Sequence, residues 1–188
     1  MLENRTEIMK YETKGGLFAK PFQAVLYDDS IAVNHKGKEM DISFESLAVI
    51  SPDADSPWFS YYNENEKWKS ITIPESPLSG DAAQLLNLIA TTHAKWLLKD
   101  VTPENIYQTK ISFGEFLELD NGEFFNKNRK KSAELVHVNE IATMQDGYGN
   151  VEEILLEGVN HKGKDGKTLL KVPQVSNIHA LIEVINMK

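Results

Sequence analysis

The chain lacks cysteine and has no long apolar run. Without cysteine it forms neither disulfide bonds nor thiolate metal sites. No stretch approaches the roughly 20 apolar residues of a bilayer-spanning helix, and the first twenty residues lack the apolar core of a signal peptide. We therefore expect a soluble, cytoplasmic protein that is not an integral membrane protein.

Basic residues are outnumbered, with 20 Lys and Arg against 28 Asp and Glu and a net charge of −8. Affinity for nucleic acid rests on accumulated positive charge, so this balance argues against a nucleic-acid partner. One local basic group stands out, formed by Lys127, Arg129, Lys130 and Lys131. It is either a solvated hairpin tip, the ordinary use of such residues, or a patch for an anionic lipid or another anionic ligand.

No catalytic or metal-binding pattern is present. The five histidines lack ligand spacing, and no cysteine can complete a zinc site. The carboxylate pairs Asp53 with Asp55 and Glu152 with Glu153 have no apolar setting that would shift their pKa values toward acid and base roles. We predict a non-enzymatic protein without metal or cofactor.

What is present is a chain of ordinary globular composition, 41% hydrophobic and 26% charged, with an internal similarity between residues 25–90 and 116–186. In each copy an apolar strand runs into an acidic turn, residues 25–29 matching 116–120. Strands with basic hairpin tips follow, and then bent or bulged strands at residues 42–50 and 136–144. A shorter match, residues 11–14 with 107–110, either extends the repeat upstream or arises by chance.

Both copies end in the same way. An apolar residue followed by proline closes the last strand, at Ile73–Pro74 and Val172–Pro173, because proline cannot donate a ladder hydrogen bond. A helix follows, and Ser176 is the expected N-cap of the second one. Apolar residues at helical spacing predict the faces turned to the sheet: Ala82, Leu85, Leu86 and Ile89 in the first helix, and Ile178, Leu181, Ile182 and Ile185 in the second.

This order, a strand meander closed by one amphipathic helix, resembles the pleckstrin-homology superfold and the small bacterial pleckstrin-homology-like (PH-like) domains. The resemblance implies an α+β, mainly β chain of two tandem PH-like units, residues 1–100 with an extended helix and residues 101–188. Each unit is expected to be a bent antiparallel sheet or partial barrel capped by its carboxy-terminal helix. Phosphoinositide-binding members carry basic residues in the first turn, whereas Asp28, Asp29 and Asp120 stand there in this chain and would repel a phosphorylated headgroup.

PH-like domains bind peptides, proteins or lipids, so the fold alone does not assign a role. The aromatic residues are the best candidates for a protein-interaction or interdomain surface, and we single out Trp58, Tyr61, Trp68 and Trp96. The sequence thus predicts a non-enzymatic interaction or scaffold module with a protein partner. The alternatives are an anionic-ligand binder that uses the basic hairpin, and one continuous barrel that carries a small apolar ligand.

Overall fold

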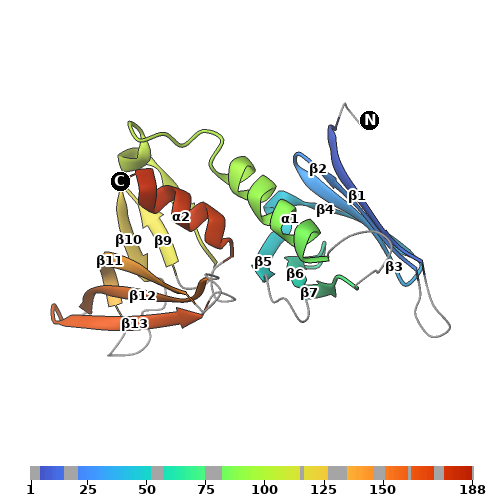
Figure 1. Cartoon of the computed structure of the whole chain (residues 1–188). Coiled ribbons are helices and arrows are strands. Elements are labelled where there is room, and N and C mark those ends of the chain that lie inside the picture. The colour runs from blue at the N-terminus through green and yellow to red at the C-terminus, as the bar shows by residue number, and fades with distance from the viewer. Residues whose placement is uncertain are drawn as a thin grey trace. The chain divides into compact units, whose positions relative to one another are not determined.

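The computed structural model describes residues 5–14, 21–51, 57–74, 82–114, 117–126, 135–145, 151–160, 162–171 and 176–187. The chain divides into two compact units, Met1–Leu97 and Leu98–Lys188. Antiparallel strands dominate the described residues, with one longer helix near the end of each unit, so the chain is α+β and mainly β (Figure 1).

The first unit contains two antiparallel sheets. The four-stranded sheet has the order β1-β2-β3-β4, with β1 at Glu7–Thr13, β2 at Phe22–Tyr27, β3 at Ser30–His35 and β4 at Lys38–Ser43. The three-stranded sheet has the order β5-β6-β7, with β5 at Leu47–Ser51, β6 at Trp58–Tyr62 and β7 at Trp68–Thr72. Alternation explains the burial: Phe22, Ala24 and Leu26 of β2 face the core, and the residues between them do not.

The strand expected at residues 42–50 is in fact two strands. A 3₁₀ turn, η1 at Phe44–Ser46, separates β4 from β5 and carries the chain from one sheet to the other. Phe44 is only 1% exposed, and its N–H donates to the carbonyl of Asp29 at 2.9 Å. The drift in phase seen in the sequence therefore marks the change of sheet, which buries Phe44 at the corner.

Helix α1 spans Ala82–Leu97 and lies beside the strands of the first unit (Figure 1). The predicted stripe is confirmed, because Ala82, Leu85, Leu86 and Ile89 are all 0% exposed and belong to the core cluster formed with both sheets. Full burial of each large apolar side chain stabilises the unit by about 1.5–3 kcal/mol.

The second unit has one six-stranded sheet, in the order β13-β12-β11-β10-β9-β8. After η2 at Ile106–Gln108 come β8 at Lys110–Ser112, β9 at Leu117–Asp120, β10 at Glu123–Asn126, β11 at Leu135–Gln145, β12 at Val151–Asn160 and β13 at Asp165–Lys171. The predicted bulges in β11 are confirmed by shifts of its register with β12. The described strands thus form three separate sheets in two units and not the single continuous barrel of the ligand-carrier alternative.

Gly158 permits the close approach of β11 and β12. It lies opposite Val138, beside a register shift in β11, and a Cβ atom at Gly158 would lie 1.9 Å from the carbonyl oxygen of His137. Only glycine fits against this backbone.

Helix α2 spans Ile178–Met187, and its buried face differs from the prediction. The predicted burial of Ile178 and Leu181 is confirmed, at 7% and 0% exposure. Ile182 and Ile185 are only partly buried, and Asn177, Ala180 and Val184 are 0% exposed in their place. The buried stripe is therefore rotated by one residue. The N-cap prediction for Ser176 is wrong as well: the side-chain oxygen of Asn177 accepts from the N–H groups of His179 and Ala180, at 3.0 and 3.2 Å.

Strand pairing aligns the two units differently from the sequence match. The first two-residue turns follow Tyr27 and Asp120, so these two residues correspond. The sequence match instead places Asp29 opposite Asp120, a difference of two residues. Tyr11 pairs with Ala24, which is three residues before Tyr27. The equivalent position in the second unit is Phe113, whose N–H donates to the carbonyl of Leu117 at 2.8 Å.

Tyr107, the residue that the sequence matched with Tyr11, lies instead in η2 and is 57% exposed. Tyr11 and Phe113 are both 0% exposed. Strands β1 and β8 therefore each pair with the next strand of their own unit in the same way. The strand pairing matches Tyr11 with Phe113 and not with Tyr107, so the short sequence match of residues 11–14 with 107–110 is not supported.

A second correspondence lies in the hairpins β6–β7 and β12–β13. The side-chain oxygen of Asn63 accepts from the N–H groups of Asn65 and Lys67 at 3.1 and 3.0 Å. The side-chain oxygen of Asn160 accepts from those of Lys162 and Lys164 at 2.8 and 3.2 Å. Both turns also have a positive φ three residues after the asparagine. The two hairpins are built on the same turn.

Candidate functional site

The first candidate site is an aromatic surface, defined as Trp58, Tyr62 and Trp68. Trp58 and Tyr62 alternate along β6 with Phe59, which is 0% exposed and faces the core. Trp68 of β7 pairs directly with Tyr62. All three side chains therefore lie on the face of the β5–β7 sheet that turns away from the core, where Trp68 is 51% and Tyr62 43% exposed.

The two indoles of this surface contact each other. Their ring centroids lie 6.3 Å apart at an interplanar angle of 71°, an edge-to-face contact. Ser60 lies between them in the register, opposite Ser70, and is 0% exposed although it is on the outer face. The indoles thus form an apolar cover over the middle of the sheet. Tryptophan has only two rotatable side-chain bonds, so a contact through these indoles costs little conformational entropy.

Tyr61 is not part of the aromatic surface. It packs against the core, and its O–H donates to the sulfur of Met40 at 3.3 Å. The sequence analysis singles out Tyr61 and not Tyr62. The signal that distinguishes them is the parity of β6, since Phe59 and Tyr61 point to one face and Trp58 and Tyr62 to the other.

Trp96 also serves its own unit. Its ring stacks on His93 with centroids 5.9 Å apart and an interplanar angle of 15°, and it meets Phe44 edge to face at 6.2 Å. Of the four residues singled out in the sequence, the structure brings Trp58 and Trp68 together, whereas Tyr61 and Trp96 pack within the unit.

His93 is a buried titratable group in this cluster. It is 4% exposed and touches Phe44 edge to face at 5.4 Å. Burial lowers the pKa of His93 to about 4, and a hydrogen bond with the backbone of Phe44 opposes the shift. The imidazole is therefore neutral at pH 7 and packs as an aromatic side chain.

The second candidate site is a groove on the outer face of the β1–β4 sheet, with a volume of about 680 Å³. Its lining includes Val25 and Ala32, which pair across β2 and β3. Asp41 of β4 continues the same row, since it pairs with Ala32. Glu39 and the amides of Gln23 and Asn34 line the neighbouring row. We call this surface the Arg5 groove, because Arg5 lines its other end.

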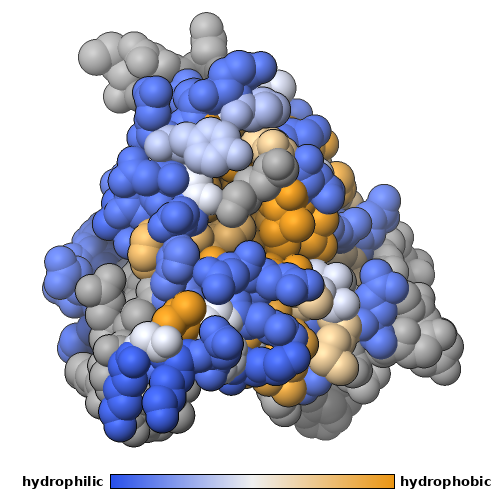
Figure 2. Space-filling model, turned by 90° about the vertical axis from the view of Figure 1, so that its left-hand side faces the viewer, coloured by the Kyte–Doolittle hydropathy of each residue, from blue (hydrophilic) through white to orange (hydrophobic). Residues whose placement is uncertain are grey.

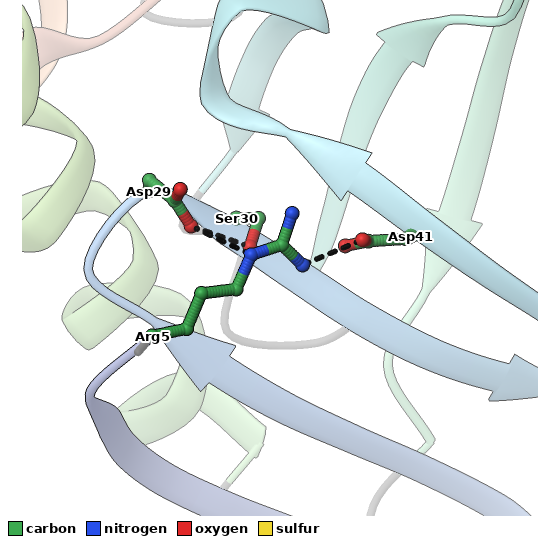
Figure 3. Close-up of polar contacts among 4 residues, drawn as sticks. All are labelled: Arg5, Asp29, Ser30 and Asp41. Atoms are coloured by element: carbon green, nitrogen blue, oxygen red, sulfur yellow. Dashed lines mark hydrogen bonds and ion pairs between the residues drawn. The ribbon is translucent and has the colours of Figure 1, made fainter. Parts of the chain in front are cut away.

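Arg5 joins two carboxylates at this end of the groove (Figure 3). Its Nη1 donates to Oδ2 of Asp41 at 2.6 Å, and its Nε lies 3.5 Å from Oδ1 of Asp29. The guanidinium carbon lies 6.0 Å from the ring centroid of Tyr27. The hydrogen bond to Asp41 raises the pKa of Arg5 above its ordinary value, so the side chain is a permanent cation here.

The local structure explains why Asp29 is in position. Ser30, 1% exposed, donates its hydroxyl to the Asp29 Oδ1 that faces Arg5, at 2.7 Å. The carbonyl of Asp29 meanwhile accepts the N–H of Phe44 at 2.9 Å. The acidic turn, interpreted in the sequence as a barrier to phosphorylated headgroups, thus supplies one of two carboxylates for a guanidinium.

The proposed basic patch of Lys127, Arg129, Lys130 and Lys131 lies outside the described residues. Val172 and Pro173, which are expected to close the last strand of the second copy, also lie outside them. Within the described part of the second unit, Lys162 and Lys164 are exposed at the β12–β13 turn, and Lys167 pairs with Glu157.

Across the described residues, no group of three or more histidine, aspartate or glutamate side chains is arranged to hold a metal ion. Neither described α-helix has the length and apolar character needed to cross a membrane. No family model matches the chain, and no curated protein matches it.

Figure 2 shows one face of the molecule, on which the exposed side chains are mostly hydrophilic and the hydrophobic ones occupy a smaller area.

Proposed function

We propose that the chain is a tandem duplication of a PH-like unit and acts as a non-enzymatic module that binds a protein partner through the aromatic surface. Two features support the duplication. The units share the order of their hairpins and their final helix, and they use the same asparagine turn at Asn63 and Asn160. In the first unit, the four-stranded sheet, the three-stranded sheet and the closing helix have the order expected of a PH-like domain.

The observation that carries the interaction role is the exposure of Trp68 beside Tyr62 on the outer face of the β5–β7 sheet. The core of the unit does not require these side chains, because Phe59 and Ile71 already cover the inner face at 0% and 3% exposure. Tryptophan and tyrosine are the residues that most often dominate the binding energy of protein interfaces. Truncation of a central aromatic residue commonly costs about 2 kcal/mol or more of binding energy, which corresponds to roughly thirtyfold in affinity.

The test compares affinity capture from native cell extract by the intact chain, by Trp68→Ser and by Leu169→Ser. Leu169 is a matched control, since it is 49% exposed but lies on β13 of the second unit. We expect Trp68→Ser to lose the captured protein and Leu169→Ser to retain it. Far-UV circular dichroism melts establish that both variants remain folded.

Equal capture by both variants would refute the aromatic surface as the binding site. Failure of the intact chain to enrich any protein over bare resin would refute the interaction role itself.

A further inference from the structure

We propose that the Arg5 groove binds an extended peptide segment that carries an arginine, and that the incoming guanidinium takes the place of Arg5 between Asp29 and Asp41. The groove lies on the β1–β4 sheet and shares no residue with the aromatic surface. The inference therefore stands apart from the proposed function.

The site already holds the chemical group that it would recognise. Two carboxylates from separate elements, the β2–β3 turn and β4, approach one guanidinium, at 3.5 Å from Asp29 and 2.6 Å from Asp41. A planar cation with several N–H donors suits this spacing, and an ammonium is a poorer match because it is compact. The Tyr27 ring adds an aromatic face 6.0 Å away.

Arg5 is exchangeable, whereas its two carboxylate partners are held in place. Arg5 precedes β1, outside the hydrogen-bonded strand, and its side chain remains 30% exposed. Asp41 is within β4, and Asp29 is oriented by Ser30. Exposed ion pairs contribute little individually. An external arginine that also contacts the groove can therefore compete with Arg5.

The composition of the groove also favours a cationic segment. Beyond the guanidinium position, Val25 and Ala32 provide an apolar strip for a small side chain. The amide of Asn34 beside it is suited to contact the polar backbone of an extended segment, and Glu39 adds a further acidic group. The amide of Gln23 also lines the groove and donates to Oε1 of Glu12 at 2.6 Å. The volume of about 680 Å³ accommodates a few residues. Charge complementarity thus selects a cationic segment over an acidic one.

The experiment titrates acetyl-Ala-Arg-Ala-amide into the ¹⁵N-labelled full chain and follows the amide signals of β2–β4. The same tripeptide with citrulline in place of arginine is the ligand control. The protein variants are Arg5→Gln, Arg5→Gln with Asp41→Asn, and Lys95→Gln. Lys95 is the matched control, because it is exposed on α1, outside the groove lining, and its replacement removes the same single positive charge.

Removal of the built-in competitor should raise the affinity of Arg5→Gln for the arginine peptide by about tenfold over the intact chain. Addition of Asp41→Asn should reduce it again by about fivefold. Lys95→Gln and the citrulline peptide should not show the gain in affinity, and Trp68→Ser should bind as the intact chain does.

Three results would overturn the proposal. The first is equal binding of the arginine and citrulline peptides to Arg5→Gln. The second is an equal gain in affinity from Lys95→Gln, which would make net charge the cause. The third is an absence of shifts in β2–β4 for Arg5→Gln.

Discussion

Burial of His93 should make the stability of the first unit depend on pH. Burial lowers the pKa of the folded-state imidazole from the ordinary 6.5 to about 4. Above pH 6.5 the imidazole is neutral in both states, and the free energy of unfolding has its full value. As the pH falls from 6.5 toward about 4, the unfolded chain binds a proton that the folded chain does not, so the free energy of unfolding decreases progressively.

The size of the effect follows from linkage. With pKa values of 6.5 and about 4 in the unfolded and folded states, the unit should lose about 2 kcal/mol between pH 7 and pH 5. In urea this corresponds to a decrease of about 1 M in the unfolding midpoint. Tryptophan fluorescence reports the first unit alone, because all three tryptophans of the chain lie in Met1–Leu97.

The control is His93→Gln, which lacks a titrating group at this position. The variant retains the pH response of every other group, including His35, whose pKa burial also lowers. The difference between the intact chain and the variant therefore isolates His93. Midpoints that fall equally in both proteins between pH 7 and pH 5 would refute the reasoning, as would an intact chain that is more stable at pH 5.

Further predictions concern glycine contacts and turns, each measured by urea unfolding. Gly158→Ala should lower the free energy of unfolding of the second unit by about 3 kcal/mol, because the new Cβ atom would collide with the carbonyl of His137. Gly163→Ala, at φ +71° with open space around it, should lower it by only about 1 kcal/mol. A cost at Gly158 no larger than at Gly163 would contradict the close approach of β11 and β12. Asn63→Ala and Asn160→Ala should each cost about 1 kcal/mol; tryptophan fluorescence should detect only the change at Asn63, and a turn that loses no stability would show that the side-chain hydrogen bonds are dispensable.

The buried face could be predicted from the sequence for α1 but only in part for α2. In α1 the predicted positions Leu85, Leu86 and Ile89 are fully buried, because a stripe of aliphatic residues bordered by polar ones has only one face to bury. In α2 apolar residues occur nearly all around the helix, so spacing alone did not determine the rotation. Packing placed Ala180 and Val184 against the core and left Ile182 at its margin.

The strands show the same division. Alternation located most strands, but it does not say which face of a two-sided strand the core will cover. The sequence therefore singles out Tyr61 for a protein-interaction or interdomain surface and not Tyr62, whereas the structure turns Tyr61 toward Met40 and leaves Tyr62 exposed. A buried corner at Phe44 likewise divided a strand that looked continuous.

The sequence by itself determined the composition class, the mainly β character with two amphipathic helices, and the apolar positions that build most of the core, because these depend on local periodicity. Only the tertiary structure decided which residues meet across long separations. Arg5, Asp29 and Asp41 carry no shared motif, and the pairing of β1 through β4 brings them to one end of a groove. Strand register and sheet packing are properties of the folded chain, and the contacts of a surface site follow from them.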